Sequence, residues 1–148
     1  MTALACDHAG YILKEEIKKY LDSIGEEYTD FGTDSEESVD YPIYAAKAAH
    51  AVADGKCSRG ILCCGTGIGI SIAANKVKGI RAACCTEEYS VEMTRKHNDA
   101  NILCMGARVI DTDTAIKLTK IFFKTEALTE ERHLRRVKML EDIENGLM

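Results

Sequence analysis

The sequence predicts an α/β fold in which one open, parallel β-sheet carries helices on both faces. Short apolar stretches alternate with stretches of helical periodicity along all 148 residues, and the connections between them are short. The most apolar stretch, residues 60–64, is continuous, which is typical of a strand buried on both faces of a parallel sheet. A chain of this length is expected to form a single domain, residues 1–148.

Five strand-helix units are predicted in succession. The first combines a strand at residues 2–6 with a helix whose apolar residues recur every three or four positions until Gly25. A weaker strand at 27–30 precedes a helix at 43–54, and Pro42 suits the first turn of that helix because the N–H that proline lacks is unpaired there. The other strands are predicted at 60–64, 80–85 and 102–105, and the other helices at 70–76, 87–97 and 112–124.

A sixth helix is predicted at the C-terminal end. After Thr129, apolar residues return at helical spacing at Leu134, Val137, Leu140 and Ile143. This helix is additional to the five strand-helix units. We therefore expect it to pack on a partner subunit.

Composition narrows the functional classes. Twenty-four acidic residues against 19 basic ones give a net charge of -5, which disfavours a broad nucleic-acid or anionic-membrane surface. The seven cysteines are odd in number and include no Cys-x-x-Cys pair, so neither a disulfide framework nor a zinc ribbon is supported. No apolar stretch approaches the roughly 20 residues that span a bilayer. We expect a reducing, cytoplasmic compartment, with neither nucleic acid nor membrane as partner.

The functional site is predicted at the carboxyl ends of the strands, where ligands bind in open parallel sheets. Ionisable side chains and glycines follow four of the five predicted strands. These segments are residues 7–10, 65–71, 86–88 and 106–108.

A glycine loop directly after the third strand is the strongest single motif. Gly65, Gly67 and Gly69 alternate between a buried strand and a helix, where successive N–H groups can hold an oxyanion or a phosphate. The dinucleotide fingerprint is not met, because counting from Gly65 the third glycine position holds Ile70, and the lysine of a triphosphate loop is absent. A tight strand-to-helix turn without a ligand is the alternative interpretation.

Cys64 is the cysteine with a candidate chemical role. It ends the third strand directly before the glycine loop, where a thiol facing helix N–H groups can act as a base or a nucleophile. Cys63, Cys84 and Cys104 are expected to be buried as small apolar residues, and Cys57 to be a loop thiol. Cysteine-based phosphatase chemistry is set aside because the position six residues after Cys64 holds isoleucine instead of arginine.

Histidine and arginine residues supply further candidates. His97 ends a predicted helix, where it either titrates near neutrality or interacts with the helix dipole. Arg132 and Arg136 lie one helical turn apart and either clamp a phosphate or form a solvated run with neighbouring glutamates. His8 and Arg108 follow strand ends and could add to an anion site. No ligand spacing supports a metal.

Several segments together resemble the ribose-5-phosphate isomerase B family, whose wider group includes galactose-6-phosphate isomerase. They are CDHAG at 6–10, DYP at 40–42, CGTGIGISIAANK at 64–76, GIRA at 79–82 and HNDAN at 97–101. The resemblance runs almost from end to end. It implies a three-layer, Rossmann-like fold and a metal-independent aldose–ketose isomerase with no cofactor. It also implies an enediolate intermediate and a homodimer or dimer of dimers with the active site at the subunit interface.

The resemblance further implies a role for each site residue. Cys64 is the base that moves a proton between carbons 2 and 1 of the opened sugar, since one branch of the family has serine there and a glutamate where Ile70 stands. Thr66 and His97 assist ring opening, and Asp7 and Tyr41 bind sugar hydroxyls. The enediolate is held by Gly65, Gly67, Ile68, Gly69, Ile70 and Ser71 with Asn98. The phosphate is held by His8, Arg108, Arg132 and Arg136, with His97 and Arg108 reaching in from the neighbouring subunit.

Three other functions fit the same sequence. The first is isomerisation of a six-carbon sugar phosphate, such as allose 6-phosphate or galactose 6-phosphate, by the same chemistry. The second is a non-catalytic module that binds a phosphorylated ligand. The third is a thiol redox or metal protein.

Overall fold

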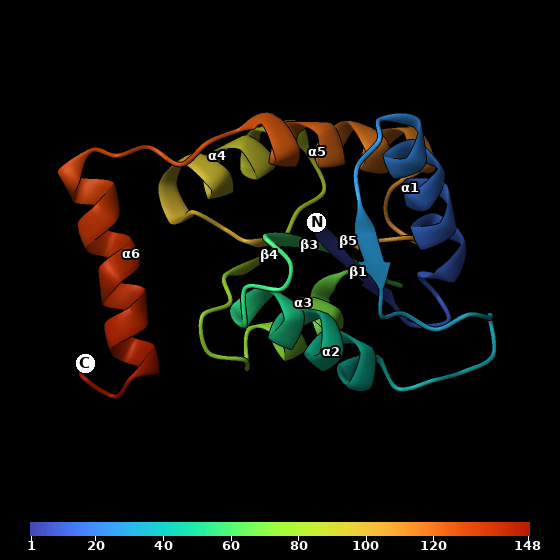
Figure 1. Cartoon of the computed structure of the whole chain (residues 1–148), viewed down its shortest axis with the longest axis horizontal. Helices are drawn as coiled ribbons and strands as arrows, with labels where there is room; N and C mark the ends of the chain where they lie inside the picture. Colours follow the sequence, from blue (N-terminus) through green and yellow to red (C-terminus); the bar gives the residue numbers. More distant parts are fainter.

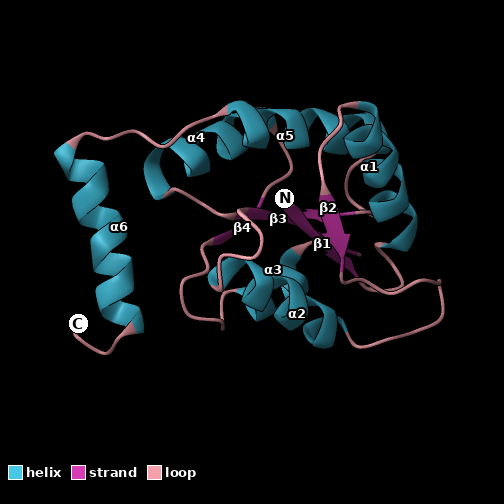
Figure 2. Ribbon diagram, viewed as in Figure 1, coloured by secondary structure: helices cyan, strands magenta, loops and turns pink.

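The computed structural model describes residues 1–148 and confirms the predicted α/β architecture with one parallel sheet (Figure 1). The strand order is β2-β1-β3-β5-β4, and all four pairings are parallel. Figure 2 shows the strands as a band between two helical layers, with α1, α4 and α5 on one side and α2 and α3 on the other. No helix is both long and apolar enough to cross a membrane.

The elements follow the predicted order. The strands are β1 (Thr2–Cys6), β2 (Tyr28–Asp30), β3 (Arg59–Cys64), β4 (Ala82–Cys84) and β5 (Ile102–Gly106). The helices are α1 (Tyr11–Ser23), α2 (Tyr41–Ala53), α3 (Ile68–Ala74), α4 (Glu88–Asn98), α5 (Thr112–Lys124) and α6 (Glu131–Glu144).

The sheet separates two hydrophobic layers, because successive side chains of a strand point to opposite faces. Leu4 and Ile61 lie in the layer under α1, α4 and α5, whereas Ala3 and Leu62 lie in the layer under α2 and α3. The second layer is rich in alanine, including Ala45, Ala48 and Ala49 of α2, which are fully buried. Small side chains let α2 lie close to β1 and β3.

β4 is shorter than the strand predicted at 80–85, because it lies at the edge of the sheet and pairs only with β5. On its open side, the Asn75 side chain accepts a hydrogen bond from Ala82 N at 2.8 Å and donates one to Ala82 O at 2.9 Å. This amide takes the place of a further strand. It also blocks the edge against pairing with another chain.

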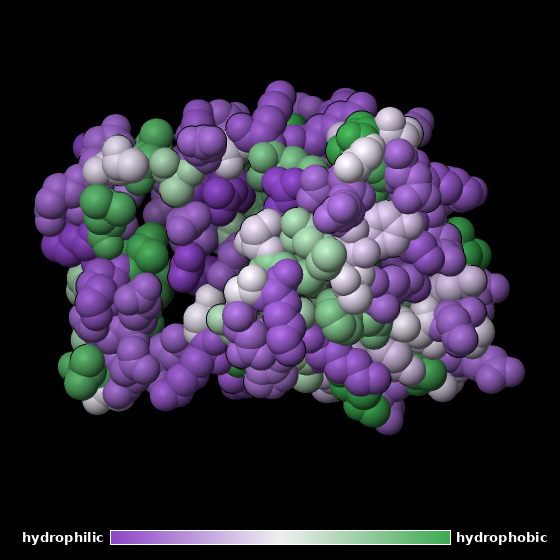
Figure 3. All heavy atoms as spheres, in the orientation of Figure 1, coloured by the Kyte–Doolittle hydropathy of each residue, from purple (hydrophilic) through white to green (hydrophobic).

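α6 stands apart from the rest of the molecule, beyond α4 and β4 (Figure 1). The exposed fractions of Leu134, Leu140 and Ile143 are 56%, 45% and 57%. Figure 3 shows such apolar side chains on α6 beside a hollow, and a cavity of about 440 Å³ lies between α6 and the β4 region. The apolar side of α6 is thus largely uncovered within one chain.

Candidate active site

The carboxyl ends of β1, β3 and β5 bring three of the predicted segments together. In the register, Cys6 lies opposite Cys63 and Cys64 lies opposite Gly106. Beyond the strand ends, Ala107 N donates to Cys64 O at 2.9 Å and Arg108 N donates to Gly65 O at 3.0 Å. The glycine loop is therefore anchored to the segment that follows β5.

The backbone of the glycine loop places an N–H group on the Cys64 sulfur. Gly67 has a φ of 79°, a left-handed conformation that favours glycine, and its N–H donates to Cys64 Sγ at 3.1 Å. A Cβ at Gly67 would lie 2.8 Å from the carbonyl carbon of Met105, so no larger residue fits. The thiol and the loop therefore form one rigid unit.

Four further N–H groups of this loop have no hydrogen-bond acceptor within the chain. They belong to Gly65, Thr66, Gly69 and Ile70. The side chain of Ile70 is fully buried, and Ser71 Oγ donates to Ile68 O at 2.7 Å. Ile70 thus offers a ligand only its main chain. Free N–H groups at the start of a helix are suited to bind an oxyanion.

The thiol of Cys64 differs from the other buried thiols of the sheet in its position. Its exposed fraction is 5%, and it lies at the strand end. Burial raises the pKa of Cys6 to about 12 and that of Cys85 to about 11, and it also raises the pKa values of Cys63 and Cys104 well above the usual range of a thiol. These four thiols stay protonated at neutral pH and pack as small apolar groups.

Cys84 is placed differently from the prediction, and Cys57 is a loop thiol that is nevertheless buried. Cys84 is exposed, because it ends the edge strand β4, and its Sγ donates to Thr66 O at 3.6 Å. Cys57 is 3% exposed, because the chain after α2 turns back and Cys57 N donates to Ala51 O at 2.9 Å. The prediction of a buried Cys84 was wrong, whereas Cys57 lies in the loop between α2 and β3, as expected, with its thiol buried.

Side chains from two other elements lie against the glycine loop. A Cβ at Gly69 would come within 2.9 Å of the Tyr41 ring, and a Cβ at Gly65 within 3.1 Å of Arg108 Nη1. Both glycines therefore make room for a neighbouring side chain. Arg108 was expected from a neighbouring subunit, but its guanidinium lies on the loop of its own chain.

Asp7 and His8 follow β1 at the same edge. Asp7 Oδ1 accepts a hydrogen bond from Gly10 N at 3.0 Å, which fixes the turn into α1. His8 Nδ1 accepts from Val39 N at 3.2 Å, so the neutral ring carries its proton on Nε2. His8 can therefore donate a hydrogen bond through Nε2.

Four of the predicted residues do not reach this edge within one chain. His97 and Asn98 end α4, and a helix that follows a parallel strand returns to the amino ends of the strands. Arg132 and Arg136 are exposed on α6. No hydrogen bond or ion pair joins any of the four to the glycine loop.

The arginines predicted to bind an anion have no carboxylate partner within the chain. Of the seven arginines, Arg59, Arg81, Arg95 and Arg135 form ion pairs with carboxylates. The three that form none are Arg108, Arg132 and Arg136. Their positive charge is thus available to a ligand. The neighbouring glutamate Glu131 pairs with Arg135 instead, which argues against the solvated charge run as the role of Arg132 and Arg136.

His133 is a residue that the sequence reasoning missed. Its ring stacks on that of His97 with centroids 4.6 Å apart and planes 5° apart, and neither of its nitrogens has a hydrogen-bond partner. Burial and the charges of His97 and Arg132 lower the pKa of His133, which favours the neutral ring. Its position between Arg132 and Arg136, two candidate site residues, was the sequence feature that could have pointed to it.

The chain contains no group of three or more His, Cys, Asp or Glu side chains placed to hold a metal ion. What the carboxyl edge offers instead is a thiol, a rigid loop with free N–H groups and a cation on that loop. Together with the parallel sheet, these groups define an α/β enzyme that stabilises negative charge on a small anionic substrate.

Comparison with known proteins narrows this class of enzyme to one family. The family described as Ribose/Galactose Isomerase matches residues 2–140. Ribose-5-phosphate isomerase B of Escherichia coli is 47% identical over 142 residues, 96% of this chain and 95% of that protein. D-erythrulose-4-phosphate isomerase of Pectobacterium atrosepticum is 45% identical over 125 residues, 84% of this chain and 82% of that protein. The solved structure of Clostridium thermocellum ribose-5-phosphate isomerase B has a TM-score of 0.96 at 50% identity, covering 99% of each chain.

The chain therefore belongs to the ribose/galactose isomerase family, as an aldose–ketose isomerase of sugar phosphates of the ribose-5-phosphate isomerase B type. The family resemblance and the fold class expected from the sequence are both confirmed.

Proposed function

We propose that this enzyme interconverts ribose 5-phosphate and ribulose 5-phosphate through an enediolate. The observation that carries the proposal is the hydrogen bond from Gly67 N to Cys64 Sγ, 3.1 Å long, beside four unpartnered loop N–H groups. An enediolate requires a base next to donors that hold a negative oxygen. The name of the Escherichia coli relative supports the five-carbon substrate.

In this mechanism the Cys64 thiolate removes the proton from carbon 2 of the opened aldose. The electron pair of that C–H bond forms the C1–C2 double bond of the enediolate, and the carbonyl oxygen becomes negative. The N–H groups of the loop stabilise this oxygen. As the thiol returns its proton to carbon 1, the hydroxyl proton on oxygen 2 moves to oxygen 1, which leaves the carbonyl of the ketose at carbon 2. One such donor is worth about 3 kcal/mol of barrier.

The remaining roles follow the position of each side chain. Thr66 Oγ1 accepts the Ile68 N–H at 3.2 Å, so its own O–H can donate to the ring oxygen of the closed sugar. Asp7 and Tyr41 bind sugar hydroxyls, and His8 and Arg108 bind the phosphate from the same chain.

A second copy of the chain supplies the residues that one copy lacks. His97 and Asn98 lie at the edge opposite the thiol, and Arg132 and Arg136 lie on a helix whose apolar side is uncovered. Two copies related by a two-fold axis, with their sheets antiparallel, bring the helix ends of each copy to the loop of the other. We therefore propose a homodimer, or a dimer of dimers, with a composite site.

The test is an isomerisation assay on ribose 5-phosphate with a chelator present. We expect turnover with the native chain, unaffected by the chelator, and faster than on allose 6-phosphate, galactose 6-phosphate or D-erythrulose 4-phosphate. Faster turnover on another of these sugars would reassign the substrate. Tight binding without exchange of the carbon 2 proton in heavy water, followed by proton NMR, would identify a binding module instead.

A further inference from the structure

A second basic cavity lies at the amino ends of the strands, opposite the catalytic loop. Its volume is about 400 Å³. Three arginines from different elements line it: Arg59 begins β3, Arg81 precedes β4 and Arg95 lies in α4. The rest of the lining is Ser58, Asp99, Ala100, Asn101, Phe122 and Phe123.

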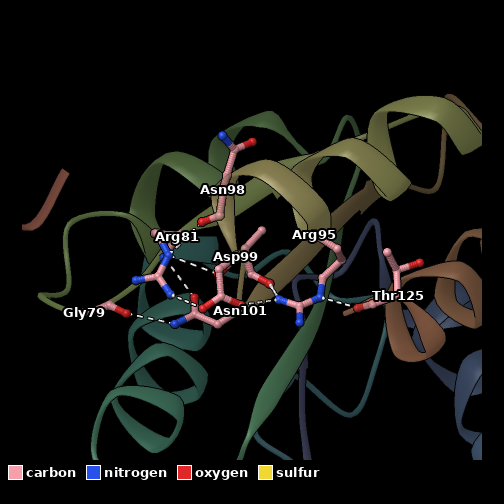
Figure 4. Close-up of polar contacts among 8 residues, drawn as sticks. Gly79, Arg81, Arg95, Asn98, Asp99, Asn101 and Thr125 are labelled. Atoms are coloured by element: carbon pink, nitrogen blue, oxygen red, sulfur yellow. Dashed lines mark hydrogen bonds and ion pairs between the residues drawn. The ribbon is translucent and has the colours of Figure 1, made fainter. Parts of the chain in front are cut away.

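The charge of this lining is positive. Asp99 is its single carboxylate, and it lies between two of the arginines (Figure 4). Asp99 Oδ2 is 3.2 Å from Arg81 Nη2, and Asp99 Oδ1 is 2.8 Å from Arg95 Nη1. The carboxylate that pairs with Arg59 belongs to Glu26, outside the lining. Three cations thus face one anion on a chain whose net charge is -5.

Each of the three guanidinium groups keeps one terminal nitrogen without a partner in the protein. For Arg59, Nε donates to Thr2 Oγ1 at 3.2 Å and Nη2 to Glu26 at 2.8 Å, which leaves Nη1. For Arg95, Nε donates to Thr125 O at 3.1 Å and Nη1 to Asp99, which leaves Nη2. For Arg81, Nε donates to Asn98 O at 3.0 Å and Nη2 donates to Asp99 Oδ2 at 3.2 Å, which leaves Nη1.

Aromatic rings hold two of these groups in place. The Arg59 guanidinium carbon lies 3.5 Å from the centroid of the Phe123 ring, and that of Arg95 lies 5.5 Å from the Phe122 ring. Stacking occupies the faces of a guanidinium and leaves its N–H edges free for an anion. The side-chain exposures of Arg59 and Arg95 are only 27% and 19%, so the groups are preorganised.

We propose that this cavity binds a phosphate dianion, either free or carried by a small metabolite. Fixed guanidinium edges match the oxygens of a phosphate in pairs, and the volume accommodates the group with a short carbon skeleton. Within one chain the cavity lies at the edge opposite the catalytic loop, because β3 runs from Arg59 to Cys64. Arg81 Nε donates to Asn98 O at 3.0 Å, and Asn98 belongs to the proposed composite site, so Arg59 is the arginine that tests this cavity alone. The proposal does not depend on which sugar the enzyme isomerises.

The experiment follows the amide signals of the ¹⁵N-labelled full chain while inorganic phosphate is added. We expect saturable shifts at Ser58, Arg59 and Asn101, with sodium chloride at equal ionic strength causing none. Arg59→Gln should weaken this binding about tenfold or more, because it removes a charged donor. Arg59→Lys, which keeps the charge but not the planar edge, should fall between. Turnover without added phosphate should match the native chain.

Several outcomes would overturn the proposal. Shifts confined to residues 65–70 would mean that phosphate binds only at the catalytic loop, and equal shifts with chloride would mean unspecific screening. Because the native chain itself reports the location, the test holds even if the Arg59 variants do not fold. A parallel titration with glycerol 3-phosphate separates the two sources: tighter binding than inorganic phosphate indicates a metabolite. An inactive chain with shifts at Arg59 would refute the proposed function alone.

Discussion

The glycine loop and α6 carry parts of the same proposed site. Within a single chain the glycine loop is fully anchored, whereas α6 lies away from that loop. Cys64, Gly67 and Arg108 are held together by backbone hydrogen bonds between neighbouring strand ends. α6 instead touches the body through the His97–His133 stack and the bond of Gly79 N to Glu144, and its apolar side lines the open cavity between α6 and the β4 region. Sheet geometry alone positions the proposed base and oxyanion donors, whereas the remaining residues of the proposed site would come from a second copy of the chain.

The largest expected effect tests the self-contained region. Cys64→Ala should lower kcat at least about a hundredfold at every protein concentration, because the base is lost while the small side chain leaves the fold intact. Turnover of ribose 5-phosphate measures the loss of activity, and far-UV circular dichroism measures whether the fold is intact. The matched control is Cys84→Ser, whose hydroxyl can still donate to Thr66 O. Near-normal turnover of Cys64→Ala would refute the assignment of the base.

A backbone substitution in the same loop comes next. Gly67→Ala should lower the free energy of unfolding by at least about 2 kcal/mol, because it combines a left-handed conformation with a clash against Met105. Urea unfolding measures this loss. Gly25 has a similar φ of 71° but no atom within 4 Å of its Cβ position. Gly25→Ala should therefore lower the free energy of unfolding by only about 1 kcal/mol. Equal losses in the two variants would show that the contact with Met105 contributes nothing.

A smaller effect is expected from the arginines of α6. Arg132→Gln should raise KM about tenfold or more with little change in kcat, because a charged hydrogen bond to the phosphate is lost from ground and transition states alike. Steady-state kinetics measures the split between KM and kcat. Arg135→Gln, on the same helix but paired with Glu131, should leave KM unchanged. If the two variants behave alike, Arg132 does not bind the phosphate.

The smallest effect should depend on protein concentration. Ile143→Glu should weaken self-association by about 1 kcal/mol, roughly fivefold in Kd, because it places a charge on the apolar side of α6. Sedimentation velocity and the specific activity on dilution measure this change. The control is Ile12→Glu on α1, since both isoleucines are 57% exposed. A native chain that is monomeric and fully active would contradict the composite site.

Most of the fold could be predicted from the sequence, because buried strands and amphipathic helices have distinct periodicities. α5 was predicted with its observed bounds, and Glu87, at which the sequence predicts a helix to begin, caps α4 by accepting from Ser90 N and Tyr89 N. The length of the edge strand β4 was overestimated, because an apolar run in the sequence does not show how many neighbouring strands will pair with it. The burial of Cys84 was wrong for the same reason.

The site was predictable only in part. The rule that ligands bind at the carboxyl ends of parallel strands located Asp7, Cys64 and Arg108 correctly at one edge. The same topology places His97 at the opposite edge, which no local motif reveals. Nor does sequence spacing show the stack of His133 on His97, because the two lie in different helices.

The exposure of Cys84 has a consequence for chemical labelling. It is the one exposed thiol among seven, and its sulfur donates a hydrogen bond to Thr66 O in the glycine loop. A maleimide or an iodoacetamide should therefore react there first and crowd the substrate without modifying Cys64. Inactivation by an alkylating agent would not identify the base, whereas a single dye at this position would report on ligand arrival.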